Sequence, residues 1–156
     1  YRGILPGENS PVAIKTMARD SHQGEREFLA ELQIISKLSH RNLVPLRGWH
    51  CVRDHRELVL VYDYMPQGSV ESALFHKGDA LLLLWDARLR ILSGLAAALI
   101  YLHEDWEHIH RDVKCSNVMP DDEFRARLGD FGLVRTASHD VSSRTTTLAG
   151  TLGYIA

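Results

Sequence analysis

The spacing of apolar residues changes along the chain from patterns typical of strands to patterns typical of helices. Residues 11–17 form a short apolar segment with β-branched side chains, which predicts a strand. Residues 43–46 and 58–62 are also typical of short strands, and the second run is continuous enough to be buried on both faces. Over residues 24–38 the apolar positions recur every three or four residues, which predicts a helix with one buried face (Phe28, Leu32, Ile35 and Leu38).

The second half of the chain is predicted to consist mainly of helix and loop. Residues 65–69 contain Pro and Gly and predict a turn. The longest helical pattern covers residues 86–103, with Asp86 suited to the N-cap or the first turn and an apolar stripe of leucines (Leu89, Leu92, Leu95, Leu99 and Leu102). Short strands are expected around residues 117–119 and 126–128, before a polar Ser/Thr-rich segment. Strands followed mostly by helix and loop indicate an α+β fold.

Composition and charge exclude several classes of protein. The 156 residues are 45% hydrophobic and 24% charged, which is typical of a globular chain. A net charge of −2 provides no basic surface, so we expect no nucleic-acid partner. The two cysteines, Cys51 and Cys115, cannot form a disulfide framework and suit a reducing compartment. No apolar run approaches the roughly 20 residues of a transmembrane helix, so we expect no membrane contact by this stretch.

The residues that carry the chemistry lie in two short motifs. Residues 110–117 read HRDVKCSN, and residues 130–132 read DFG. Asp112 can orient a hydroxyl nucleophile, while Asn117 and Asp130 offer hard oxygen ligands for Mg²⁺. The spacing between Asn117 and Asp130 leaves room for a strand, a turn and a returning strand, so the two ligands can meet at the strand ends. These groups are what in-line phosphoryl transfer from a magnesium nucleotide requires.

Taken together with Val-Ala-Ile-Lys at residues 12–15, the two motifs resemble the signature set of eukaryotic-type protein kinases. The resemblance runs through nearly the whole chain. Lys114 in the catalytic loop and Gly-Thr at residues 150–151 are similar to serine/threonine kinases rather than tyrosine kinases. Longer strings, among them REFLAE at 26–31 and HRNLV at 40–44, resemble plant receptor-like kinases of the legume-lectin type.

This resemblance implies a two-lobed, protein-kinase-like fold that is truncated at both ends. Residues 1–65 would form a partial N-lobe, with a strand, a regulatory helix, further strands and the hinge. Residues 66–156 would form a partial C-lobe, with the long helix, the catalytic loop and the activation segment. The glycine-rich phosphate loop and the C-terminal helices of the family would lie outside the chain.

The resemblance also implies a nucleotide site for ATP. Lys15 would contact the α and β phosphates, and Glu31 on the following helix would hold the Lys15 ammonium in place. The backbone of Asp63 and Met65 would bind the adenine edge, and Tyr62 would close the back of the pocket. Alone, Val-Ala-Ile-Lys would more simply be a strand whose final lysine extends to water.

For the catalytic loop, the resemblance implies Asp112 as the base and Lys114 as the partner of the γ-phosphate. Asn117 and Asp130 would share the Mg²⁺. An isolated Asp-Phe-Gly would more often be a turn with a buried Phe, so these roles depend on the complete set of motifs. His110 is predicted to be a structural hydrogen-bonding residue rather than a base.

Residues 130–156 resemble an activation segment. Arg111 would pair with a phosphate there, and Thr145 and Thr146 are the first candidate phosphorylation sites. Thr151 would support the base and the peptide substrate. A cluster of serines and threonines is also common in plain surface loops, so this alternative stays open.

The predicted function is that of a serine/threonine protein kinase that uses ATP and Mg²⁺ to phosphorylate protein substrates. The resemblance further implies a receptor-like parent in the plasma membrane, with this part in the cytosol and possible association between kinases for trans-phosphorylation. The alternative is an inactive truncated kinase or pseudokinase that acts as a binding or scaffold module, and the isolated fragment itself is expected to be inactive. A third interpretation, an unrelated α+β domain, would require the whole motif set to be accidental.

Overall fold

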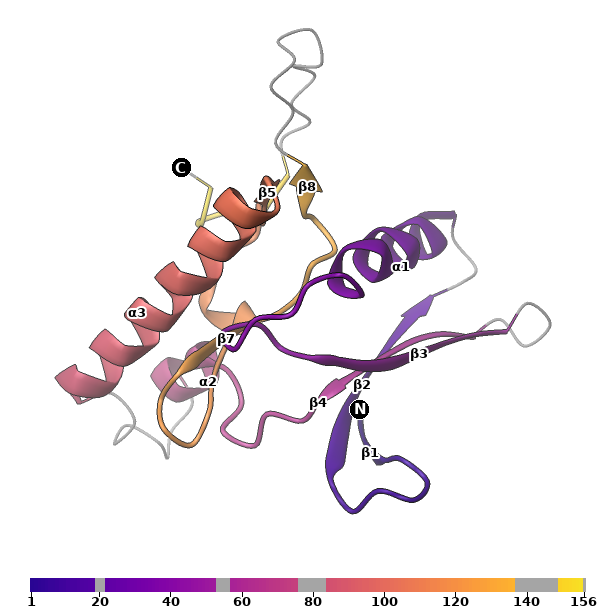
Figure 1. The fold of residues 1–156 in the computed structure, drawn as a ribbon, viewed down its shortest axis with the longest axis horizontal. Coiled ribbons are helices and arrows are strands. Elements are labelled where there is room, and N and C mark those ends of the chain that lie inside the picture. Colours follow the sequence, from indigo (N-terminus) through magenta and orange to yellow (C-terminus); the bar gives the residue numbers. More distant parts are fainter. Residues whose placement is uncertain (19–21, 53–56, 76–83, 137–148, 156) are drawn as a thin grey trace, which may run out of the picture.

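A computed structural model describes residues 1–18, 22–52, 57–75, 84–136 and 149–155 of the chain. A four-stranded sheet with one helix lies on one side of the molecule, and two further helices with two short two-stranded sheets lie on the other (Figure 1). The α+β fold predicted from the sequence is confirmed. Among the described residues, no helix has the length and apolar character needed to cross a lipid bilayer.

The sheet consists of β1 (Arg2–Ile4), β2 (Pro11–Ala18), β3 (Leu46–Val52) and β4 (Glu57–Asp63). The strands are antiparallel in the order β1-β2-β4-β3, so β4 pairs on both edges. The prediction that β4 is buried on both faces was wrong. Leu58, Leu60 and Tyr62 are buried, but the alternating residues Val59 and Val61 remain partly exposed.

The prediction of a strand at residues 43–46 was also wrong. Leu43 forms an isolated bridge with Leu128, and the strand β3 begins only at Leu46. Its sequence, LRGWHCV, lacks the apolar alternation that would reveal a strand. Pairing with β4 at every residue except Arg47 explains why it nevertheless forms.

Helix α1 (His22–Ile35) packs on the sheet through the predicted apolar face. Phe28 and Ile35 are buried and Leu32 is partly buried. The helix ends three residues before the predicted end at residue 38. The N–H of Leu38 donates to the carbonyl of Ile35, so the chain closes the helix with a tighter turn before it leaves toward β3.

The helical side contains α2 (Val70–Phe75) and α3 (Trp85–Ile100), and α3 continues into a π-helical turn (Tyr101–Asp105). Asp86 lies in the first turn of α3, and Leu84 occupies the N-cap. The predicted leucine stripe was wrong in the first half of α3, because Leu89 is 53% and Leu92 is 59% exposed. Small or medium side chains face the core instead (Ala87, Ile91 and Ala98, followed by Leu102 in the π-helical turn).

Two short two-stranded sheets complete the helical side. Strands β6 (Val118–Pro120) and β7 (Ala126–Leu128) pair antiparallel, which confirms the two strands predicted there. Strand β5 (His108–Ile109) pairs with β8 (Arg135–Thr136), and a 3-10 turn (Cys115–Asn117) leads into β6.

The segment that follows α1 joins the two sides. Leu128 of β7 donates its N–H to the carbonyl of Asn42 at 2.8 Å and accepts from the N–H of Val44 at 2.9 Å. The Asn42 side chain donates to the carbonyl of Ala126 at 2.8 Å. A single apolar core runs through both sides and includes residues from the sheet, α1, α3 and β7 (Phe28, Leu60, Ile91 and Leu128 among them).

Candidate active site

The first half of the candidate site brings together β2, α1 and the residue that follows β7 by two positions. The Lys15 Nζ lies 2.8 Å from Glu31 Oε2 and 2.7 Å from Asp130 Oδ1. Glu31 is completely buried, and its other oxygen, Oε1, accepts a 2.6 Å hydrogen bond from the Tyr62 hydroxyl. In the sheet, Lys15 pairs with Leu60 of β4, two residues before Tyr62. The register between β2 and β4 therefore places Lys15 and Tyr62 near the same Glu31 carboxylate.

In this group one ammonium, that of Lys15, contacts two carboxylates. Burial alone would lower the pKa of Lys15, but the Glu31 and Asp130 carboxylates outweigh it and hold this pKa above its ordinary value. Burial and then the Glu31 charge raise the pKa of Tyr62 strongly. At neutral pH the site therefore holds a Lys15 ammonium and a protonated Tyr62 that donates to Glu31.

The second half of the site is centred on Asp112. Its Oδ1 accepts from the Thr151 hydroxyl at 2.6 Å, and its Oδ2 lies 2.8 Å from Lys114 Nζ. Lys114 also donates to Thr151 Oγ1 at 2.9 Å, so the three side chains form a closed ring of polar contacts. The Asn117 amide nitrogen donates to the Asp112 carbonyl at 2.9 Å and to its Oδ2 at 3.2 Å.

These contacts keep the Asp112–Lys114 pair ionised. Burial alone would raise the pKa of Asp112, but hydrogen bonds from Lys114 and Thr151 outweigh it and hold that pKa below its ordinary value. The hydrogen bond with Asp112 raises the pKa of Lys114. The pair is therefore a carboxylate and an ammonium throughout the neutral range.

His110 holds the catalytic-loop segment against the chain after β7. The side chain is buried, its Nε2 lies 3.1 Å from the Gly129 carbonyl, and its Nδ1 accepts from the Asp112 N–H at 3.3 Å. Burial lowers the pKa of His110 below its ordinary value. The hydrogen bonds assign a neutral ring protonated at Nε2, consistent with the predicted structural role. The ring also makes an edge contact with Phe131 at 5.4 Å.

The two halves face a common cavity between the sheet and the β6–β7 hairpin. A cavity of about 270 Å³ is lined by Lys15 and Glu31, by the predicted adenine contacts Asp63 and Met65, and by Asn117 and Asp130. A neighbouring cavity of about 560 Å³ shares Lys15, Glu31 and Asp130 with it and reaches Asp112. The structure thus gathers residues that are far apart in sequence around two neighbouring cavities.

The donor atoms of Asn117 and Asp130 suit Mg²⁺. Both residues line the same cavity, and both can offer oxygen. The Asn117 nitrogen is turned toward Asp112, which leaves the amide oxygen for a cation. The Asp130 carboxylate is 42% exposed and contacts Lys15 through Oδ1. No cluster of three or more His, Cys, Asp or Glu that could hold a metal occurs in the described residues, and Mg²⁺ typically takes its remaining ligands from phosphates and water.

The amino-acid sequence of the chain is similar to those of known proteins. Residues 1–154 match the family model described as protein tyrosine and serine/threonine kinase. The chain belongs to this kinase family. The family and the two-lobed type of fold predicted from the sequence are therefore confirmed.

Curated relatives of this kinase chain are plant receptor kinases. The chain is 52% identical to L-type lectin-domain containing receptor kinase IX.2 and 51% identical to IX.1, both from Arabidopsis thaliana. It is 50% identical to L-type lectin-domain containing receptor kinase SIT2 from Oryza sativa subsp. japonica. Each alignment covers 100% of the chain but only 23–24% of the relative, so the chain spans about a quarter of these proteins.

The regulatory residues predicted for this kinase chain are only partly described. Thr145 and Thr146 lie outside the described residues. Thr151 joins the Asp112 ring, and Arg111 has a left-handed backbone with a φ of 68°. Arg111, Asp112 and Thr151 line a further cavity of about 290 Å³.

Sequence reasoning missed one contact of the kinase site. Tyr62 was expected to close the back of the pocket, but its hydroxyl also holds the buried Glu31 carboxylate. The signal that could have revealed this contact is the period of β4. Tyr62 shares a face with Leu58 and Leu60, the face that becomes buried, so its hydroxyl needs a partner there.

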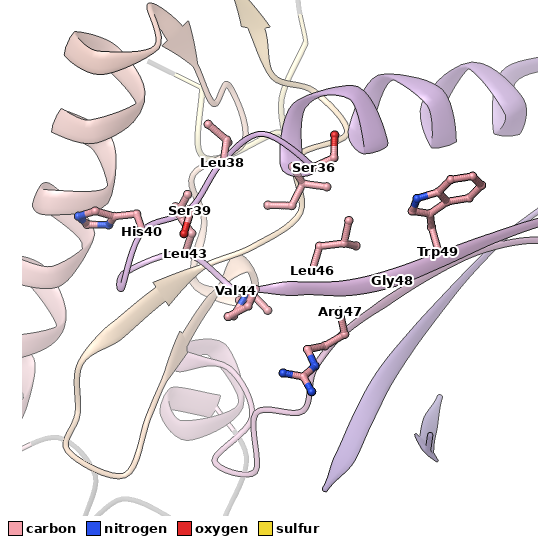
Figure 2. Close-up of a pocket in the computed structure, with 12 residues that line it drawn as sticks. Ser36, Leu38, Ser39, His40, Leu43, Val44, Leu46, Arg47, Gly48 and Trp49 are labelled. Carbon is pink, nitrogen blue, oxygen red and sulfur yellow. The ribbon is translucent and has the colours of Figure 1, made fainter. Parts of the chain in front are cut away.

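A hollow outside the kinase site lies between the end of α1 and β3 (Figure 2). Its volume is about 390 Å³, and Leu46 and Trp49 point from β3 into the space below α1. It shares Val44 with the cavity of about 270 Å³ described above and contains none of the predicted site residues.

Proposed function

We propose that the chain forms the core of a serine/threonine protein kinase domain, which transfers the γ-phosphoryl group of Mg·ATP to hydroxyl groups of proteins. The observation that carries this proposal is that the Lys15–Glu31–Asp130 group lines two cavities, one of which also contains Asn117 and the other Asp112. Lys114 and Thr151 beside Asp112 support the serine/threonine preference. We place the boundary between the two lobes at residues 65 and 66, in the link between β4 and α2.

The nucleotide would lie in the cavity between the sheet and the β6–β7 hairpin. The backbone of Asp63 and Met65 would bind the adenine edge between the apolar side chains that line the cavity (Ala13, Val44 and Met119). Lys15 has three N–H donors, and two of them are used by Glu31 and Asp130. The remaining donor is available for a phosphate oxygen. Asn117 and Asp130 would hold Mg²⁺, which neutralises charge on the phosphate oxygens when bound.

Asp112 would orient the substrate hydroxyl. Because its pKa is lowered, Asp112 is a weak base that accepts a hydrogen bond from the hydroxyl and takes its proton only as the new bond to phosphorus forms. Lys114 stays protonated and offsets the negative charge that develops on the transferred group. The ring with Thr151 keeps both side chains in place.

The kinase family and the named relatives support a proposal for regulation and location. Phosphorylation of Thr145 or Thr146 would provide an anion for Arg111 and would order the activation segment. Association of two kinase chains would allow trans-phosphorylation. The parent protein would be a receptor-like kinase anchored in the plasma membrane, with this part in the cytosol.

The decisive experiment is phosphate transfer from radiolabelled Mg·ATP by the purified full-length kinase domain, with identification of the phosphorylated amino acids. Asp112→Asn should lower the rate by about 10²- to 10⁴-fold and retain nucleotide binding, because Asp112 orients the hydroxyl and not the nucleotide. Arg125→Gln is a matched control, since Arg125 is an exposed residue of the β6–β7 turn. A wild type no faster than Asp112→Asn would contradict the proposal and favour the scaffold alternative. Transfer to tyrosine alone would contradict the serine/threonine preference.

A further inference from the structure

Strand β3 contains an irregularity at Arg47. Leu46 pairs with Tyr62 and Gly48 pairs with Val61, so Arg47 is an extra residue in the ladder between β3 and β4. Such a bulge changes the direction of the side chain it carries. Figure 2 shows the result, because Leu46 and Trp49 both point toward α1 whereas Arg47 points to the opposite side. In a regular strand, residues three positions apart would face opposite sides.

The bulge aims the Arg47 guanidinium at two carboxylates from different segments. Its Nη2 donates to Glu8 Oε2 at 2.9 Å, and its Nε lies 3.6 Å from Asp63 Oδ1. Glu8 belongs to the turn between β1 and β2, where its N–H donates to the carbonyl of Leu5. Asp63 is the last residue of β4. Arg47 therefore connects the tip of the β1–β2 hairpin with the end of the central strand.

The segment that carries Arg47 holds Asp63 in a second way. The N–H of Asp63 donates to the carbonyl of Pro45 at 3.1 Å. The backbone and the side chain of Asp63 are thus both fixed by residues 45–47. Asp63 lines the cavity of about 270 Å³, whereas Arg47 does not, so any effect of Arg47 on a ligand there is exerted through Asp63 and Glu8.

We propose that Arg47 is a positioning residue for the nucleotide, which holds the backbone of Asp63 and the β1–β2 hairpin in the arrangement that accepts adenine. The inference rests on the proposed function, in which Asp63 and Met65 bind the adenine edge. Arg47, Glu8 and Asp63 are each about 40% exposed, so salt screens their attraction. Nucleotide affinity therefore contains a salt-dependent part that arises from residues which do not touch the nucleotide.

The test measures binding of Mg·ADP by calorimetry, which requires no catalytic turnover. In about 10 mM salt, Arg47→Gln and Glu8→Gln should each weaken binding about two- to fivefold relative to wild type. The double variant should bind Mg·ADP almost as tightly as Arg47→Gln alone, because both changes break the same contact. In about 1 M salt, where the screening length falls from ~30 Å to ~3 Å, variants and wild type should bind alike.

Two further measurements make the result specific. Amide exchange at Asp63 and Tyr64 should be faster in Arg47→Gln, since the end of β4 is less restrained. Arg125→Gln removes an arginine of similar exposure that pairs with Asp121 and Glu123 away from the cavity, so it should leave Mg·ADP affinity unchanged. Glu8→Gln changes only an exposed turn residue and keeps the test valid if an Arg47 variant folds poorly.

Each outcome has one meaning. Wild-type affinity in both Arg47→Gln and Glu8→Gln at low salt would overturn the role of Arg47 and leave the proposed kinase function intact. A loss that persists unchanged at high salt, or an equal loss in Arg125→Gln, would indicate a general structural effect and would also overturn it. A wild-type protein that does not bind Mg·ADP would contradict the proposed function, and this inference with it.

Discussion

Glu31 is a buried carboxylate whose two oxygens have different partners. Lys15 contacts Oε2, and the Tyr62 hydroxyl donates to Oε1. Removing a charge from water costs free energy, and this cost remains when one of the hydrogen-bond donors of the charge is lost. Each partner of Glu31 therefore contributes more to stability than an exposed contact of the same length. Tyr62 therefore supports the same side chain that positions Lys15.

We expect Tyr62→Phe to lower the free energy of unfolding by about 1–3 kcal/mol, because the buried Oε1 of Glu31 loses its donor while the ring still fills its place. Urea denaturation monitored by circular dichroism would measure the change. Tyr1→Phe is the control, since Tyr1 is 88% exposed and its hydroxyl should not contribute. Equal stability of Tyr62→Phe and wild type would show that water replaces the lost hydroxyl.

For single residues, the sequence predicts which side chains act together better than it predicts the hydrogen bonds through which they meet. The order of motifs was enough to suggest that Lys15 and Glu31 belong together, and the structure places them 2.8 Å apart. The ring in which Thr151 donates to Asp112 while it accepts from Lys114 depends on the fold of two distant loops. No local pattern in the sequence contains that information.

Among the elements, α3 illustrates a physical limit of periodicity. The pattern of large apolar residues selected Leu89 and Leu92 as buried, but both are exposed. The helix instead approaches β7 at Gly94. A methyl group at Gly94 would lie 2.8 Å from the Asn42 side-chain nitrogen and 3.0 Å from the backbone nitrogen of Ala126. Close approach selects the smallest residues, whereas a hydrophobic pattern selects the largest.

Gly94→Ala should therefore destabilise the protein, although alanine favours helix by up to about 1 kcal/mol over glycine. The added methyl group must displace backbone at Ala126, and overpacking of this kind costs about 1–3 kcal/mol. Thermal unfolding would show a lower midpoint for Gly94→Ala. The neighbouring Ser93→Ala, on the exposed face of α3, should change stability by less than about 0.5 kcal/mol. A higher midpoint for Gly94→Ala would mean that α3 moves to accept the methyl group.

Strand β3 shows a second limit at the scale of elements. Its sequence has neither alternation nor a continuous apolar run, and its bulge at Arg47 depends on the partner strand. Elements whose pattern matches their burial were found close to their predicted bounds, as for β2 and the β6–β7 hairpin. Elements that form because a neighbouring strand pairs with them were not found close to their predicted bounds.

For the whole molecule, stability should depend on pH through two histidines. Burial lowers the pKa of His110, and burial followed by the Arg41 charge lowers the pKa of His40. The unfolded chain binds protons near the ordinary value of 6.5, while the folded chain resists protonation to lower pH. Protons therefore bind the unfolded state more readily in this window, and acid favours unfolding.

We expect the free energy of unfolding to fall as the pH drops through 6.5, and to be nearly constant between pH 7 and 8 where both states are neutral at these sites. Urea denaturation at several pH values would measure this dependence. His40→Gln should reduce the slope, because it removes one of the two groups whose pKa is lowered. Asp112 and Asp121, whose pKa values are lowered from 3.8, contribute only at lower pH. A flat profile from pH 8 to 5 would contradict the prediction.

The α+β class and the kinase family could be predicted because the motifs occur in a fixed order along the chain. The three-dimensional connections between the two sides could not. Asn42 and Val44 join β7 through backbone groups, which are chemically the same at every residue. A sequence therefore shows where such bonds are possible but not which partner they choose.

The pairing of residues 42–44 with Leu128 also constrains how this part of the chain can vary. Gly129 and Asp130 follow Leu128 directly, and Glu31 lies on the helix that precedes residue 42. An inserted or deleted residue between Ile35 and Asn42 would shift one carboxylate relative to the other across the lysine they share. The connection after α1 should consequently keep a constant length in functional variants, while the turn at residues 121–125, which contacts neither carboxylate, is free to lengthen.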